Sequence, residues 1–154
     1  MSNRDAHLRV IEDVLERFAF MFAERDGDRK QLGNDDEYLH AQIAFKGRTT
    51  GALSIAAPFG LCEEMAANVL GLERSEIGKG AAEDTLRELA NVTCGALICE
   101  LFGASEVFDL TVPVLSRTGP GKFRELAADT EVMALWVEEQ PMLFSLVIEE
   151  GAAS

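Results

Sequence analysis

Basic residues are scarce in this sequence. It has 14 Lys and Arg against 27 Asp and Glu, so its formal net charge is −13. Nucleic acids and anionic membranes attract proteins through basic patches that neutralise phosphates, and no such patch is present. The composition therefore argues against nucleic acid and against a membrane surface as partners.

Cysteines and long apolar runs are also scarce. The three cysteines, at positions 62, 94 and 99, are an odd number without the spacing of a disulfide framework, which is typical of reduced thiols. The first 18 residues are charged throughout, unlike a signal peptide, and no apolar run reaches the length of a membrane span. We therefore expect a cytoplasmic protein.

Motifs for the commoner catalytic chemistries are missing. His7 and His40 are isolated, and neither has a second ligand at metal spacing. The glycine-rich segments 78–80 and 119–122 lack the phosphate-loop pattern, and no Gly-x-Ser-x-Gly nucleophile motif occurs. The sequence therefore predicts no metal site and no cofactor-binding motif of its own.

The pattern of apolar residues indicates one domain over residues 1–154, with a frayed tail at 150–154. A polar loop with two glycines is expected to follow the first helix. Apolar residues recur at helical or at alternating spacing along the rest of the chain. The expected elements are a helix over 4–24, a hairpin over 38–57, a short helix over 61–72, a long helix over 83–103, and three strands at 107–116, 130–139 and 142–150, with a turn-rich connection over 116–126.

This order predicts an α+β fold in which helices pack on a mixed or antiparallel sheet. A helix followed by a strand hairpin occurs twice, which suggests an internal repeat. The first helix carries Glu12 and Glu16 at the same spacing as Asp84 and Glu88 in the long helix.

The long helix carries a narrow polar stripe. At about 100° per residue, Asp84, Glu88, Asn91 and Gly95 fall within an arc of roughly 60°, opposite a leucine-rich face. Glycine costs a helix about 1 kcal/mol relative to alanine, but its missing side chain lets another surface approach closely. The simplest alternative is a solvated helix face with Arg87 as a local ion partner.

The spacing Asp84-x-x-x-Glu88-x-x-Asn91, with 21 residues between Asn91 and Pro113, resembles the signature of the CheC/CheX/FliY family of chemotaxis phosphatases. The stretch ELANVTCGA at 88–96 is similar to the ELANMIAGNA-type core of CheX proteins. CheC members carry two such helices and CheX members one active copy. Ala19 stands where the first helix would need the amide, so the chain resembles CheX.

The resemblance implies that the chain dephosphorylates the aspartyl phosphate of a CheY-type response regulator. Asn91 would orient the attacking water and Glu88 would anchor the regulator, with further partner contacts at Asp84 and Gly95. An amide cannot act as a general base, but it can position water, and positioning carries much of phosphoryl-transfer catalysis. The Mg²⁺ would be held by the regulator, so the chain needs no metal of its own.

The resemblance also implies a homodimer joined through sheet edges. The segment 142–150 is apolar on both faces, so it is expected either inside its own sheet or covered by a partner. Two other functions stay open. In the first, the chain is a non-catalytic module that binds a receiver domain or binds a flagellar-motor component. In the second, it is an acidic α+β sensor dimer without phosphate chemistry.

Overall fold

The computed structural model describes residues 3–27 and 35–149. Part of the predicted polar loop, 28–34, and the predicted frayed tail, 150–154, lie outside the described residues. The elements are α1 (Asn3–Ala19), β1 (Ala23–Glu24), β2 (Tyr38–Lys46), β3 (Thr50–Pro58), α2 (Phe59–Leu70), the 3₁₀ turn η2 (Arg74–Glu76), α3 (Ala81–Phe102), β4 (Asp109–Leu110), β5 (Val114–Thr118), α4 (Pro120–Ala128), β6 (Met133–Val137) and β7 (Gln140–Glu149).

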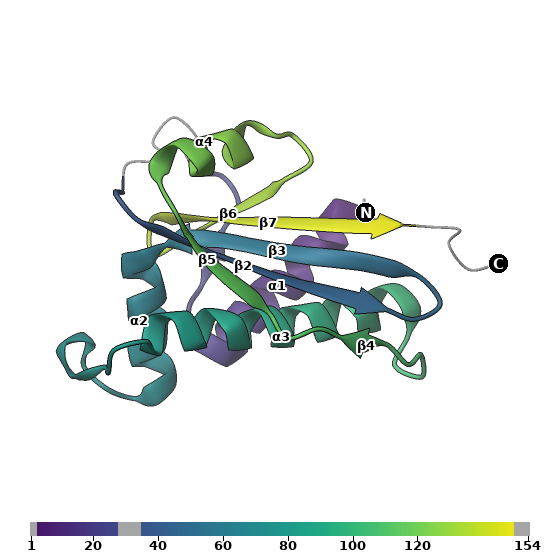
Figure 1. Cartoon of the computed structure of the whole chain (residues 1–154), viewed down its shortest axis with the longest axis horizontal. Coiled ribbons are helices and arrows are strands. Elements are labelled where there is room, and N and C mark those ends of the chain that lie inside the picture. The colour runs from purple at the N-terminus through teal and green to yellow at the C-terminus, as the bar shows by residue number, and fades with distance from the viewer. Residues whose placement is uncertain (1–2, 28–34, 150–154) are drawn as a thin grey trace.

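The strands form one antiparallel sheet with helices on both faces, which confirms the predicted α+β class (Figure 1). Its order is β1-β6-β7-β3-β2-β4, and β5 also pairs with β2 at the edge where β4 lies. The two hairpins, β2–β3 and β6–β7, are joined at the centre by the β3–β7 ladder. The two predicted hairpins are therefore neighbours in one sheet.

The main core lies between one face of the sheet and the helices α1, α2 and α3. Strand β2 turns alternate residues inward, and Leu39, Ala41, Ile43 and Phe45 are buried there. A smaller cluster on the opposite face is covered by α4, whose Phe123 ring stacks on Tyr38 with 4.0 Å between ring centroids. Helix α3 is thus held against the sheet on one side and leaves its other side outward.

Strand β7 lies inside the sheet, paired with β3 on one side and β6 on the other. This position explains why both of its faces are apolar: Phe144 points into the main core and Leu143 into the smaller one. Of the two placements expected for this segment, the structure therefore has the central one. The strand needs no partner chain to cover it.

The sequence predicted a turn-rich connection where the structure has helix α4, and this prediction was wrong. Pro120 occupies the first turn of the helix, where the missing N–H leaves no hydrogen bond unmade. Phe123 and Ala127, four residues apart, are the buried side of this helix. Gly119 and Pro120 therefore mark a helix start.

Three further boundaries differ from the prediction. Helix α1 ends at Ala19, because Phe20 adopts a positive φ of 58° and turns the chain. The expected strand over 107–116 is two short strands, since Thr111 bonds the Ala44 backbone through both its N–H and its Oγ1. The last hairpin turns at residues 138 and 139, both with positive φ, instead of at Gln140-Pro141. Among the described residues, no helix has the length and apolar character to cross a membrane.

Candidate functional site

Helix α3 provides the scaffold of the candidate site. Gly80 precedes its first turn with a φ of 87°, and the helix continues for 22 residues because apolar residues recur on one side at helical spacing. Leu86, Leu89 and Ala90 on that side are fully buried. The helix is therefore fixed in rotation, and the predicted stripe faces outward.

The stripe residues are placed largely as predicted. Asp84, Glu88 and Gly95 are exposed on α3. Asn91 is half-buried, so it is less accessible than Asp84 and Glu88. Its side-chain oxygen and nitrogen are not among the buried polar atoms without a partner, so the amide end remains accessible.

The polar groups of the stripe differ in their partners. Arg87 Nη1 donates to Asp84 Oδ1 at 2.8 Å, which is the local ion pair that the simpler alternative predicted. Within the described part of the chain, neither the Glu88 carboxylate nor the Asn91 amide has a hydrogen bond or an ion pair. The two groups one turn apart are therefore the ones free to bind something else.

Gly95 lies one turn beyond Asn91 and is exposed. A Cβ built on it would meet no atom within 4 Å, so the fold does not require glycine there. Its φ is not in the positive range, unlike those of Gly71 and Gly80. Neither packing nor backbone conformation accounts for this glycine.

The first helix does not reproduce the stripe. Glu12 Oε1 accepts a hydrogen bond of 2.6 Å from Arg25, and Ala19 is fully buried at the last position of α1. Pro113, the last part of the sequence signature, is buried in the break between β4 and β5. The first helix thus lacks an amide in this pattern, although its Glu16 is exposed.

A hollow of about 220 Å³ adjoins the stripe and was not foreseen from the sequence. Phe18, Val69 and Leu70 line one side of it, and Asp84, Thr85, Glu88 and Ala81 of α3 line the other. Val69 and Leu70 interrupt the polar side of α2 at its end. This pair of apolar residues was the feature of the sequence that could have indicated the hollow. The hollow joins apolar side chains from two helices to the acidic residues of a third.

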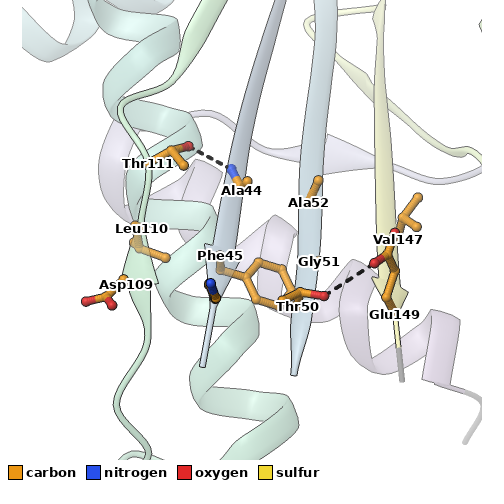
Figure 2. A pocket seen from close by; sticks show the side chains of 11 residues that line it. Ala44, Phe45, Thr50, Gly51, Ala52, Asp109, Leu110, Thr111, Val147 and Glu149 are labelled. Carbon is orange, nitrogen blue, oxygen red and sulfur yellow. Dashed lines mark hydrogen bonds between the residues drawn. The ribbon is translucent and has the colours of Figure 1, made fainter. Parts of the chain in front are cut away.

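A larger hollow, of about 480 Å³, lies elsewhere on the molecule (Figure 2). The residues that line it come from β2, β3, β7 and the segment around β4. They lie on a part of the sheet that α4 does not cover. Figure 2 shows the Thr50 hydroxyl bonded to Glu149 and Thr111 bonded to Ala44 across its borders. These polar groups are already paired, and none of the stripe residues lines this hollow.

Other reactive side chains offer little chemistry. Burial raises the pKa of the Cys62 thiol to about 12 and that of Cys94 to about 11, so both stay protonated at neutral pH. Burial lowers the pKa of His7 and of His40. Among the described residues, no group of three or more His, Cys, Asp or Glu side chains is arranged to hold a metal ion.

Comparison with known proteins places the chain in a family. The family model described as "Chemotaxis phosphatase CheX" matches residues 39–135, which include the whole stripe. The chain belongs to this family. None of the curated protein sequences matches it significantly.

Solved structures of this class share the fold at low sequence identity. A chemotaxis protein CheX from Desulfovibrio desulfuricans has a TM-score of 0.67 at 11% identity, covering 94% of this chain and 97% of its own. CheX from Vibrio vulnificus has a TM-score of 0.67 at 19% identity, covering 97% and 100%. CheX in a CheX–CheY–BeF₃–Mg²⁺ complex from Borrelia burgdorferi has a TM-score of 0.59 at 14% identity, covering 97% and 99%.

Proposed function

We propose that this protein dephosphorylates the aspartyl phosphate of a CheY-type response regulator, using Asn91 and Glu88. The observation that carries the proposal is the pair of unpartnered groups on α3, an amide and a carboxylate one turn apart, in a chain of the chemotaxis phosphatase CheX family. The Borrelia relative forms a complex with CheY, which supports a partner of that kind.

The proposed reaction requires few catalytic groups from this protein. Water attacks the phosphorus, the bond between phosphorus and the aspartyl oxygen breaks, and inorganic phosphate and a free carboxylate result, with the water proton passing to solvent. Asn91 accepts a hydrogen bond from this water and holds it in line with the scissile bond. Positioning of this kind removes part of the entropic barrier, and an amide suffices for it.

Glu88 is the proposed anchor. Its carboxylate lies one helical turn before Asn91, with a Cβ separation of about 5–6 Å expected for such pairs. A lysine of the regulator that pairs with Glu88 would therefore carry its phosphorylated site towards Asn91. Asp84 and Gly95 extend the contact along α3 on either side. Metal and phosphate both arrive with the regulator in this proposal.

The experiment follows the decay of a phosphorylated CheY-type receiver with and without this protein. The wild-type protein should accelerate decay, and Asn91→Ala should abolish the acceleration while its melting temperature changes little. Binding of Asn91→Ala to the beryllofluoride-activated receiver should stay within about twofold of the wild type. Equal acceleration by wild type and Asn91→Ala would contradict the proposed role of the amide.

The second candidate is a non-catalytic module that binds a receiver or a motor component. The shared CheX-type fold is compatible with it, but a decayed site would not need to keep the amide at Asn91. Binding of the activated receiver without any acceleration of decay would favour this second candidate.

We also propose a homodimer. The apolar faces of β7 do not support it, because β7 lies inside the sheet of its own chain. A candidate sheet edge for it is β5, whose Val114 is exposed, beside the exposed Val112 in the segment before it. Arg117 on this edge pairs with Glu83 of α3 at 3.7 Å, and Glu83 is not a stripe residue, so we expect each subunit of the dimer to keep its own site. Light scattering at micromolar concentration tests it: twice the chain mass of 16.8 kDa is expected, and a monomer mass would contradict it.

A further inference from the structure

Exposed apolar side chains gather where α1 and α2 end. Leu70, the last residue of α2, is 54% exposed, and Phe20 and Phe22 after α1 are 67% and 73% exposed. Asn68 Nδ2 donates to the Ala19 carbonyl at 3.0 Å and thereby joins the two helix ends, which lie together in Figure 1. An apolar group of this size on a monomer surface commonly marks a contact site.

The local structure fixes the backbone conformation at these positions. Helix α2 ends in a Schellman motif, in which Leu72 N–H bonds Ala67 O at 3.0 Å and Gly71 adopts a φ of 68°. The conformation of the chain at Val69 and Leu70 is therefore set by the cap. Helix α1 ends with the same handedness at Phe20, a residue that adopts positive φ only with strain.

Leu70 of this apolar group also borders the acidic stripe. Phe18, Val69 and Leu70, which we call the apolar shelf, line the 220 Å³ hollow opposite Asp84 and Glu88. Asp84 is paired with Arg87, whereas Glu88 has no partner in the described part of the chain. A ligand that fills this hollow meets one open carboxylate and an apolar wall together.

The negative charge of this surface distinguishes between the molecules that could bind in the hollow. A second copy bound across a two-fold axis at this surface would bring Glu88 towards its own symmetry mate, and each chain carries a formal charge of −13. An anionic lipid surface is repelled for the same reason. The complementary occupant is a protein surface that presents a cationic side chain beside an apolar one.

We propose that the apolar shelf binds an apolar side chain of the receiver domain, next to the lysine that pairs with Glu88. This proposal rests on the proposed function, because it takes the same regulator as the occupant. The shelf would hold the regulator during the reaction without touching the water or the phosphorus. Its loss should therefore weaken binding and leave the rate within the complex unchanged.

The test combines two readouts on the full chain. Titration of a beryllofluoride-activated CheY-type receiver gives Kd, and decay of the phosphorylated receiver at saturating protein gives the rate within the complex. Leu70→Gln and Val69→Thr should each raise Kd, Leu70→Gln by about tenfold, with an unchanged rate at saturation. Val147→Gln, at a residue 56% exposed on the distant sheet face, is the matched control and should change neither readout.

The outcomes separate the two proposals. Unchanged Kd in both shelf variants would overturn the shelf proposal, even if Asn91→Ala still abolished catalysis. A wild-type protein that binds the receiver without accelerating decay would overturn the phosphatase proposal, and the Kd values of the variants would still test the shelf. A wild-type protein that does not bind the activated receiver would overturn the shelf as a receiver site.

Discussion

Arg87 and Asp84 are joined by an ion pair of 2.8 Å on the exposed side of α3, one turn before Glu88. The Asp84 side chain is 78% exposed, so this pair adds little to stability. In the proposed complex its effect on binding should be larger, because Arg87 neutralises one of the two carboxylates that we propose face the regulator. The pair therefore lowers the negative charge of the site.

Replacement of Arg87 by alanine should tighten receiver binding. Removal of the cation leaves Asp84 unpaired beside Glu88, and we expect Kd to fall about two- to fivefold at low salt, with a smaller change at 0.5 M salt. Titrations at both salt concentrations check this. Weaker binding would mean that Arg87 itself contacts the regulator.

Reversal of the charge at Glu88 should have the opposite effect. Glu88→Lys places a cation against the regulator lysine, and we expect Kd to rise at least tenfold, equivalent to about 1.4 kcal/mol. The matched control is Glu16→Lys on α1, which makes the same change of net charge at an exposed glutamate. Equal losses in both variants would indicate a general charge effect instead of an anchor.

Alanine at Gly95 should separate stability from binding. The added methyl group meets no atom within 4 Å, so the helix should gain about 1 kcal/mol of stability. If the regulator approaches the helix there, the same methyl group should raise Kd. Denaturant unfolding and receiver titration measure the two effects. Unchanged Kd would remove Gly95 from the contact.

Glycine at Phe20 should stabilise the protein. Phe20 is 67% exposed and has a φ of 58°, so its replacement relieves strain of about 1 kcal/mol with a small loss of buried area. Phe22→Gly is the control, because Phe22 is equally exposed but has no positive φ. A lower denaturation midpoint for Phe20→Gly would show that its side chain supports the fold.

His40 should make stability depend on pH. Burial against α4 lowers its pKa below the ordinary 6.5, and Lys122 lowers it further. The unfolded chain therefore binds a proton more readily, so this contribution is complete above pH 6.5 and is lost as pH falls towards the folded-state pKa. Between pH 7.5 and 5, the unfolding free energy of His40→Gln should fall less than that of the wild type. Parallel curves would contradict this.

The sequence predicted the long helix, the central hairpins and the outward stripe, because apolar periodicity is strong in each. It did not predict α4, because glycine and proline, as at Gly119 and Pro120, occur both at helix starts and in turns. It also missed the hollow beside the stripe. That hollow depends on where the ends of α1 and α2 meet, and the Asn68–Ala19 bond that joins them is a tertiary contact without a sequence signature.

The availability of an amide group could not be read from the sequence either. The spacing placed Asn91 on the correct side of α3, but its half-buried position depends on the neighbouring packing. The distinction between a paired Asp84 and an unpaired Glu88 likewise required side-chain geometry. Periodicity therefore identified the stripe, and the structure distinguished its members.

The burial of Ala19 has an evolutionary consequence. A single codon change to asparagine would not give this chain a second site, because the amide would enter the core at the last residue of α1. Burial of an amide without partners costs on the order of 1–3 kcal/mol, which selection would remove. A descendant with two sites would first need a longer or rotated first helix. If the proposed site on α3 is correct, the burial of Ala19 therefore makes a second such site on α1 hard to gain by point mutation.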